Sequence, residues 1–243
     1  MRSISTAAAT YLSIRNLAIA EKAGYENLLV PCSECHFMLT DARYRLQLNQ
    51  QDRSEVKSRL KDENLQYPAT VKMWHSIDLF HDLITPEKIK SQVKNSFEGL
   101  TFAAHPGCQT IRPSEIGRVD HAENPQKLEN LIRALGAQVK KYPEKLDCCG
   151  ATLLYSHEET ALSLAGAKLK RLQEEGFQGL VDTCPYCHIM YDAKQKEAIS
   201  TVGGKNMIPV VYYTQLLGKA LGIPDVKLGL HLNQSFTTKD VQF

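Results

Sequence analysis

The sequence predicts an α/β protein with two related lobes, each built on a short parallel sheet flanked by helices. Short apolar segments alternate with longer segments of helical periodicity, which is the pattern of parallel α/β structure. An internal repeat indicates the two lobes, because residues 21–38 match residues 174–190. Both copies read as a helix, a glycine stop, a short apolar strand and Cys-x-x-Cys-His at the start of another helix.

The first lobe is assigned to residues 1–95. Ala8, Leu12 and Ile19 recur at helical spacing and predict its opening helix. Charged and amide side chains dominate its middle, which predicts a solvated helical connection rather than a binding surface. Its expected elements are, in order, a helix over 7–22, a strand before Cys32, a helix after Cys35, the charged connection over 41–64, a strand over 71–74 and a helix over 76–83.

The second lobe is assigned to residues 96–243 and contains parts that the first lobe lacks. Its expected elements are strands over 100–104, 139–142, 180–182 and 208–212, and helices over 125–135, 157–175, 187–198 and 214–221. Cys149 precedes Cys184 by 35 positions, and the same interval before Cys32 reaches back beyond Met1. The first lobe is therefore expected to be incomplete at its front. Either the true start of the protein lies further upstream, or this part has been lost.

Five of the seven cysteines form one pattern in the second lobe. They are Cys108, the adjacent pair Cys148 and Cys149, and the two cysteines of a Cys-Pro-Tyr-Cys motif, Cys184 and Cys187. Each group follows a predicted strand. Because the carboxyl ends of parallel strands meet at one edge of a sheet, we expect the five thiols to converge. Four thiolates would complete a zinc site, whereas a fifth favours iron–sulfur chemistry.

Histidines and an arginine lie near the cysteines in the sequence. His105, His36 and His188 are expected either to hydrogen-bond cluster sulfurs or to be ordinary loop and helix-start residues. Arg112 would either steer an anionic substrate or form a surface ion pair.

Glycines and aromatic residues complete the pattern. Gly107 and Gly150 flank cysteines and would let the backbone approach a cluster closely. Trp74 and the pair Tyr212-Tyr213 stand where a strand leads into a helix, and they are expected to lie in the core or at an interface.

The first lobe has only Cys32 and Cys35. They could be a vestige, a zinc site, half of a cluster completed by another chain, or a redox dithiol. The Cys-Pro-Tyr-Cys motif also looks like a glutaredoxin dithiol after a strand, so a simple dithiol oxidoreductase is a competing hypothesis.

Nearly the whole chain resembles the cysteine-rich CCG domain found in the B subunit of heterodisulfide reductases. Related domains occur in iron–sulfur subunits of glycolate and lactate oxidation systems. The motifs that carry the resemblance are His105-Pro106-Gly107-Cys108, Arg112-Pro113-Ser114, Asn124-Pro125, Ala134-Leu135-Gly136-Ala137, Cys148-Cys149-Gly150, Cys184-Pro185-Tyr186-Cys187-His188, Gln215-Leu216-Leu217-Gly218 and, in the first lobe, Arg15-Asn16-Leu17-Ala18.

The resemblance implies that the five cysteines of the second lobe hold one noncubane [4Fe–4S] cluster. It further implies a complex in which a ferredoxin-like C subunit and a flavin-containing A subunit supply electrons for cleavage of a disulfide between two thiol cofactors. The family uses two such clusters, one for each sulfur. This chain departs from that pattern, because its first lobe retains two of five ligands. A second cluster would need ligands from a neighbouring polypeptide.

Composition limits the other possibilities. A net charge of +2 and a pI near 8.1 argue against nucleic acid or an anionic membrane as an obligatory partner. No segment approaches the roughly 20 apolar residues that span a bilayer. Arg15 interrupts the N-terminal apolar run without a cleavage-like site, so a transit peptide is an alternative but a secretory signal is not expected. Seven cysteines without a disulfide-scaffold composition predict a reduced, cytoplasmic protein.

Three functions follow as hypotheses. The first is an oxidoreductase subunit that passes electrons to a disulfide at the cluster. The second is a non-catalytic electron-relay subunit. The third is a zinc-stabilised binding module without redox chemistry.

Overall fold

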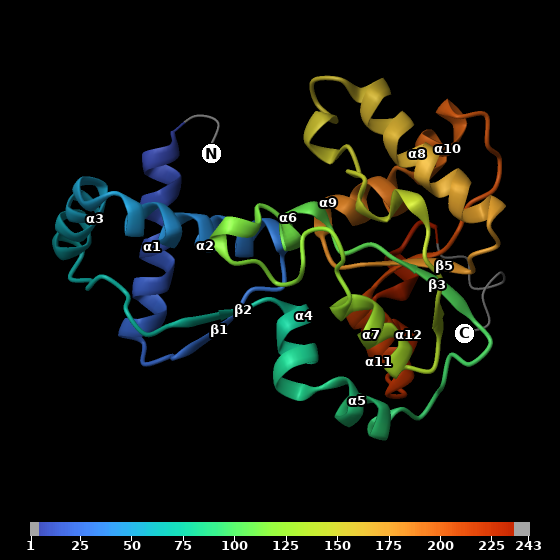
Figure 1. Ribbon diagram of the computed structural model, residues 1–243, viewed down its shortest axis with the longest axis horizontal. Helices are drawn as coiled ribbons and strands as arrows, with labels where there is room; N and C mark the ends of the chain where they lie inside the picture. The colour runs from blue at the N-terminus through green and yellow to red at the C-terminus, as the bar shows by residue number, and fades with distance from the viewer. Residues whose placement is uncertain (1–4, 236–243) are drawn as a thin grey trace.

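The computed structural model describes residues 5–235, and its central feature is a four-stranded parallel sheet in the order β4-β3-β5-β6 (Figure 1). The strands are β3 (Thr101–Ala104), β4 (Gln138–Val139), β5 (Gly179–Asp182) and β6 (Val210–Tyr212). Their short apolar runs suit this position because a parallel sheet is buried on both faces. Successive side chains point to opposite faces, so Phe102 and Val181 join one core while Ala103 and Leu180 join the other.

Helices cover both faces of this sheet (Figure 1). On one face lie α8 (Glu158–Glu174) and α10 (Gln195–Thr201), which pack against each other. On the other lie α7 (Lys127–Ala134), α11 (Tyr213–Ala220) and α12 (Asp225–Leu228), with α5 (Pro86–Gln92) beside α7. The fold is thus the α/β class predicted from the alternation of strands and helices.

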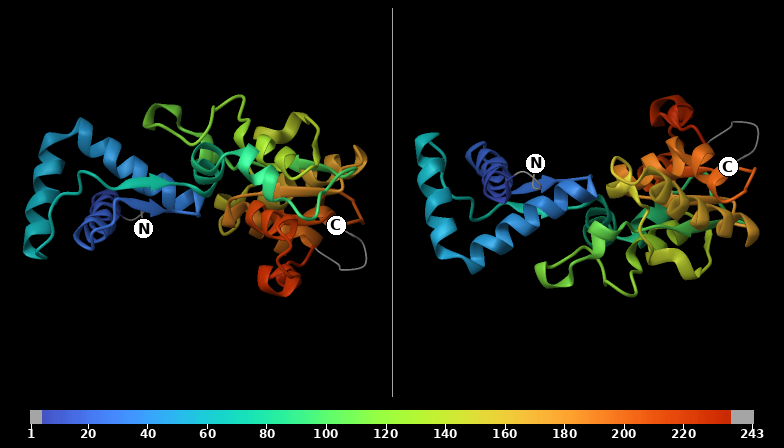
Figure 2. Two further views of the ribbon diagram at one scale, coloured as in Figure 1. Left: turned by 90° about the horizontal axis from the view of Figure 1, so that it is seen from below. Right: turned by 90° about the horizontal axis from the view of Figure 1, so that it is seen from above.

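A second, two-stranded parallel sheet pairs β1 (Asn27–Leu29) with β2 (Lys72–Trp74). It packs with α1 (Thr6–Lys22), α2 (Ser33–Leu48) and α3 (Gln50–Asp62) around a separate core, and these elements form one end of the elongated molecule (Figure 2). Ser5 begins α1 by accepting a hydrogen bond from the backbone N–H of Ala8 at 3.2 Å. The chain then continues through α4 (Ser76–Asp78) towards the four-stranded sheet (Figure 1).

The repeat makes β1 the counterpart of β5, but β1 has a free edge. On one side β5 pairs with β6 and on the other with β3, whereas within residues 5–235 β1 pairs only with β2. Tyr25 is 65% exposed and Leu29 is 51% exposed, although their counterparts Phe177 and Val181 are 7% and 0% exposed. In the four-stranded sheet these counterparts are covered by β3 and by Tyr142, whose ring lies 5.7 Å from that of Phe177. An edge strand with uncovered apolar neighbours can accept another strand.

Several boundaries differ from the sequence-based expectations. The charged region over 41–64 is not one helix and a connection but the end of α2 and the whole of α3, which Asn49 caps by accepting hydrogen bonds from two backbone N–H groups. The strand expected over 139–142 ends at Val139, because Pro143 follows and the Tyr142 hydroxyl turns back to donate to the carbonyl of Ala104 at 3.2 Å.

Two predicted helices contain π-helical turns. The helix expected over 187–198 is divided into α9 (Pro185–His188), a π segment over Ile189–Ala193 and α10. The helix expected over 76–83 is likewise α4 followed by a π segment over Leu79–Ile84. Such turns are frequent near functional sites, and here each follows a short helix, α9 or α4, that begins just after the carboxyl end of a strand.

A buried polar network joins the two sheets at their carboxyl ends. His75 Nδ1 accepts a hydrogen bond from the backbone N–H of Ile77 at 3.3 Å, so its proton lies on Nε2 and is donated to Ser33 Oγ at 3.2 Å. The hydroxyl of Thr110 donates to Ser33 Oγ at 2.8 Å, and the carbonyl of Thr183 lies 3.5 Å from the same atom. Ser33 therefore ties α2 to a short helix after β3, α6 (Cys108–Ile111), and to the loop after β5.

This network predicts an acid-sensitive stability. Burial lowers the pKa of His75 to about 3, whereas an unfolded histidine titrates near 6.5. As the pH falls below that value, the unfolded state binds a proton that the folded state excludes, so the free energy of unfolding should decrease by about 1.4 kcal/mol per pH unit.

The variant His75→Asn tests this, because asparagine keeps a hydrogen-bond acceptor but does not titrate. Denaturant unfolding at pH 8, 6.5 and 5 should show a shallower pH dependence for this variant than for the wild type. His231→Asn, at an exposed position, is the control and should leave the slope unchanged; equal slopes for all three proteins would contradict the prediction.

Candidate functional site

The carboxyl edge of the four-stranded sheet brings together the five cysteines of the sequence pattern. Cys108 begins a short helix, α6 (Cys108–Ile111), just after β3. Cys148 and Cys149 follow the turn after β4, and Cys184 follows β5, where it precedes the first residue of α9. Cys187 lies within α9. These loops meet because all the strands run in the same direction.

The five thiols form a continuous string of contacts. Side-chain interactions that shift the pKa values of these thiols link Cys108 to Cys148, Cys148 to Cys149, Cys149 to Cys187, and Cys187 to Cys184. Cys149, Cys184 and Cys187 are buried, Cys108 is half-buried and Cys148 is exposed. The string thus begins at the protein surface and ends in the core.

Electrostatics divides the string into thiolates and thiols. The thiols of Cys108 and Cys149 and the backbone N–H of Gly150, at 3.4 Å, donate to Cys148, which places the pKa of Cys148 well below its usual range. Hydrogen bonding to Cys148 raises the pKa of Cys149 to about 12. A hydrogen bond from Cys187 lowers the pKa of Cys184. Since thiolates are the form that binds metal, a bound metal group would deprotonate the others as well.

Two glycines allow this close approach. Gly107 has φ of 79°, and a Cβ there would lie 3.3 Å from Cys184 Cβ and 4.0 Å from Cys187 Sγ. Gly150 has φ of 83°, and a Cβ there would lie 2.7 Å from the carbonyl oxygen of Ala161 on α8. Glycine is required at both positions because other residues disfavour positive φ and there is no space for a side chain at Gly150.

A histidine and a lysine stand behind the buried cysteines. His105 Nε2 lies 3.3 Å from Cys187 Sγ, and His105 packs edge-on against Tyr191 with ring centroids 5.0 Å apart. Lys168, from α8, places its Nζ 3.2 Å from His105 Nδ1 and 2.8 Å from the carbonyl oxygen of Asp147. Sequence reasoning missed Lys168. The available signal was a lysine on the apolar face of the helix over 157–175, three residues after Ala165 and one before Leu169.

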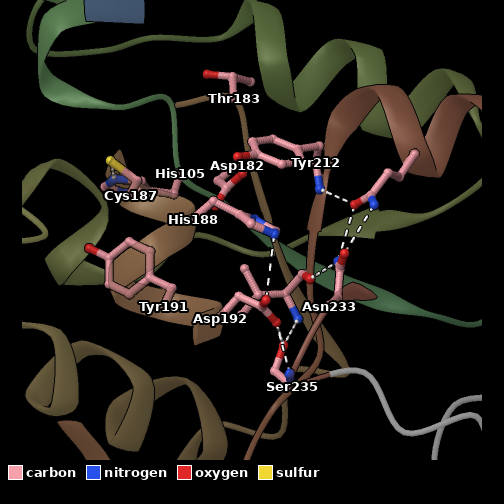
Figure 3. Close-up of polar contacts among 12 residues, drawn as sticks. His105, Asp182, Thr183, Cys187, His188, Tyr191, Asp192, Tyr212, Asn233 and Ser235 are labelled. Carbon is pink, nitrogen blue, oxygen red and sulfur yellow. Dashed lines mark hydrogen bonds and ion pairs between the residues drawn. The ribbon is translucent and has the colours of Figure 1, made fainter. Parts of the chain in front are cut away.

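His188, by contrast, binds carboxylates (Figure 3). Its Nδ1 lies 3.2 Å from Asp182 and its Nε2 3.7 Å from Asp192, while Tyr212 stacks on its ring at 3.9 Å. Burial raises the pKa of Asp182 to about 6. Burial alone would lower the pKa of His188, but the hydrogen bond and the charge of Asp182 raise it overall. Asp192 in turn accepts hydrogen bonds from the backbone N–H and hydroxyl of Ser235, so this group anchors the C-terminal segment (Figure 3).

The other residues singled out in the sequence lie elsewhere. His36 is buried beside His75, with ring centroids 5.7 Å apart, and burial lowers its pKa to about 4. Arg112 is exposed to solvent after α6. Trp74 is half-buried and donates from Nε1 to Asn27 at 2.9 Å, and Tyr213 is buried in the core.

Cys32 and Cys35 form a separate pair at the start of α2. Cys32 Sγ accepts a hydrogen bond from the backbone N–H of Cys35 at 3.4 Å, and burial together with the Cys32 thiol raises the pKa of Cys35 to about 11. Cys32 also lines a cavity of about 240 Å³ between the two sheets. The other residues that line this cavity are Pro31, Ser76, Asp182, Thr183, Pro185, Tyr212, Tyr213 and Thr214.

Neither a site for a single metal ion nor a membrane-spanning helix is found within residues 5–235. No group of three or more His, Cys, Asp or Glu side chains there is arranged to hold a single metal ion. In the same residues, no helix combines the length and the apolar character needed to cross a membrane.

Comparison with known proteins relates the chain to proteins of electron transfer. It is 32% identical over 229 residues to the B subunit of the ferredoxin/F420H2-dependent CoB-CoM heterodisulfide reductase of Methanosarcina acetivorans, covering 93% of this chain and 76% of that one. It is also 32% identical over 225 residues to the 8-methylmenaquinol:fumarate reductase membrane anchor subunit of Wolinella succinogenes, covering 93% and 78%. A hypothetical protein from Helicobacter pylori shares the fold, with a TM-score of 0.74 at 18% identity over 98% of this chain and 43% of that one.

The family model for the cysteine-rich domain, CCG, matches residues 1–40 and 102–192, more than half of the chain. These two stretches contain all seven cysteines. Together with the heterodisulfide reductase relatives, this match shows that the chain belongs to the CCG cysteine-rich domain family.

Proposed function

We propose that the chain is an iron–sulfur subunit of a heterodisulfide-reductase-like complex, in which Cys108, Cys148, Cys149, Cys184 and Cys187 hold one noncubane [4Fe–4S] cluster. The observation that carries the proposal is the string of five thiols at one edge of the sheet. Thiolate sulfur is the ligand that iron–sulfur clusters use, and five thiols exceed the four of a closed zinc site. When bound, the cluster would supply single-electron transfer and a site at which sulfur can react.

The protein's own residues have distinct tasks in this proposal. Gly107 and Gly150 let the cysteine loops approach, and His105 and Lys168 surround the buried end of the string. Cys148, which is exposed and favours the thiolate, marks the end that solvent reaches.

None of the five cysteines lines the cavity beside Cys32, but Pro185, which lies between Cys184 and Cys187, does, and this cavity is the candidate site for a thiol or disulfide substrate. At about 240 Å³ it is smaller than the 300–1,000 Å³ typical of sites that enclose a whole small molecule. It would therefore take the sulfur-bearing end of a substrate and leave the remainder outside. Pro185 and Tyr213 would exclude water from that end.

We further propose that residues 1–95 and 96–243 are two CCG lobes and that the first is completed by another polypeptide segment. The free edge of β1 supports this, as do the exposed Tyr25 and Leu29. A parallel strand at that edge would bring its following loop next to Cys32 and Cys35, as β3 brings Cys108 next to Cys184 and Cys187. Such a segment could complete a second cluster, or a zinc site, with Cys32 and Cys35.

Partners and compartment are proposed on the same grounds. A ferredoxin-like C subunit and a flavin-containing A subunit would deliver the electrons, since the relatives include the B subunit of heterodisulfide reductases. All seven cysteines are free thiols, which supports a reducing, cytoplasmic environment.

A second candidate function is electron relay without disulfide chemistry. The relative from Wolinella succinogenes favours it, because that protein is named as a subunit of a fumarate reductase. In that case the five cysteines would hold a cluster that passes electrons onward, and no thiol would bind to it.

The test is a metal analysis of the anaerobically purified chain, followed by EPR spectroscopy during oxidation with and without a small thiol such as coenzyme M. About four iron and a matching amount of sulfide per chain, with a signal that forms only with thiol, would support disulfide chemistry. Iron together with an EPR signal that is the same with and without thiol would support electron relay. Zinc without iron would overturn both and leave a zinc-stabilised binding module.

A further inference from the structure

Lys168 is a buried cation that forms no ion pair within residues 5–235. Only 1% of its side chain is exposed. Its ammonium donates to the carbonyl of Asp147 at 2.8 Å and to His105 Nδ1 at 3.2 Å, and it lies 5.5 Å from the centre of the Tyr191 ring. A buried ammonium is strongly unfavourable unless negative charge lies near it, so this position favours negative charge on the neighbouring cysteine sulfurs. The groups whose negative charge would favour the ammonium form of Lys168 are, in order, the sulfur of Cys187, the carboxylate of Asp147 and the sulfurs of Cys149 and Cys148.

The lysine also determines which nitrogen of His105 carries the proton. An ammonium group has donors only, so His105 Nδ1 must accept from it. The ring proton then lies on Nε2, which is 3.3 Å from Cys187 Sγ and donates to that sulfur.

Neither contact is replaceable by water. His105 and Cys187 are each 2% exposed and Lys168 is 1% exposed, and the Tyr191 ring lies against the Lys168 ammonium. In such an environment a fixed positive charge and a hydrogen bond to sulfur act at low dielectric and are barely screened by salt.

We propose that Lys168 is a positioning residue that raises the reduction potential of the cluster at the five cysteines, through its own charge and through the hydrogen bond that it forces His105 to donate to Cys187. The inference rests on the proposed iron–sulfur function. Hydrogen bonds to sulfur and net charge near a cluster are among the factors that set its potential. Both favour the state with one more electron, because that state carries more negative charge on its sulfurs. Lys168 itself gains and loses no electron.

The experiment is a mediated redox titration, followed by EPR, of the cluster-loaded chain and two matched variants. Lys168→Met removes the buried charge at nearly constant volume and should lower the equilibrium constant for one-electron reduction at least tenfold, which is about 59 mV in midpoint potential. Lys170→Met removes one charge from the same helix on a side chain that instead donates to the carbonyl of Val202 at 3.2 Å, and it should leave the potential unchanged. The shift should persist at high ionic strength.

Iron and sulfide content separates this inference from the proposed function. A wild-type chain without iron overturns both. Wild-type iron content in Lys168→Met at an unchanged potential overturns only the role of Lys168. If Lys168→Met does not retain iron, Lys168→Arg keeps the charge and becomes the deciding variant. If Lys168→Arg retains the cluster at the wild-type potential, the inference is supported. If Lys168→Arg also loses its iron, Lys168 is a packing residue and the inference is overturned.

Discussion

Replacement of Cys149 by serine is expected to reduce the iron content of the purified chain at least about tenfold, because loss of groups that merely support a metal ligand already costs 10–100-fold in affinity. Cys149 occupies the middle of the thiol string, where it contacts both Cys148 and Cys187, and its side chain is 5% exposed. A serine hydroxyl has nearly the same size but is a poor ligand for iron. Iron and sulfide analysis after anaerobic purification measures the effect directly.

Cys32→Ser and Cys35→Ser are the matched controls for this prediction. Both cysteines lie at the start of α2, outside the string of five. Each substitution should leave the iron content of the isolated chain unchanged if the second lobe alone builds the cluster. A loss of iron from these variants equal to that of Cys149→Ser would show that the two groups of cysteines share one metal site, and the division into separate sites would be wrong.

The sequence was sufficient to predict the sheet that positions the site, for a physical reason. Short apolar strands that alternate with helices leave few arrangements other than a parallel sheet, and parallel strands place their following loops at one edge. The strands over 100–104, 180–182 and 208–212 were therefore predicted within a few residues of β3, β5 and β6. The structure accordingly brings Cys108, Cys149 and Cys184 to the same edge.

What could not be predicted depends on tertiary packing. Sequence reasoning treated His105 and His188 alike, since each stands near a cysteine, but only His105 is directed to a sulfur. His188 is held by Asp182, at the end of β5, and by Asp192, four residues further along the same helical segment. Lys168 was missed because helical periodicity predicts which face of a helix is buried. It does not predict that neighbouring loops supply hydrogen-bond acceptors, the Asp147 carbonyl and His105 Nδ1, for a buried lysine on that face.

Gly150→Ala is expected to lower the free energy of unfolding by about 2–4 kcal/mol and to reduce iron loading as well. The left-handed backbone, with φ of 83°, costs a residue with a Cβ about 1–2 kcal/mol. The remaining cost comes from contact with α8, because the added Cβ would lie 2.7 Å from the carbonyl oxygen and 3.0 Å from the Cα of Ala161. Neither is the end of a flexible side chain, so the loop that carries Cys148 and Cys149 must move away from α8.

Gly176→Ala separates the two causes. Gly176 has φ of 75°, close to that of Gly150, but a Cβ there would have no atom within 4 Å. Denaturant unfolding should show a loss of about 1 kcal/mol for Gly176→Ala with full iron content, and a clearly larger loss for Gly150→Ala. Equal losses would mean that the backbone conformation alone requires the glycine. A larger loss at Gly150 would instead show that packing requires the glycine of the Cys-Cys-Gly motif, because only a residue without a Cβ can lie this close to the backbone of Ala161 in α8.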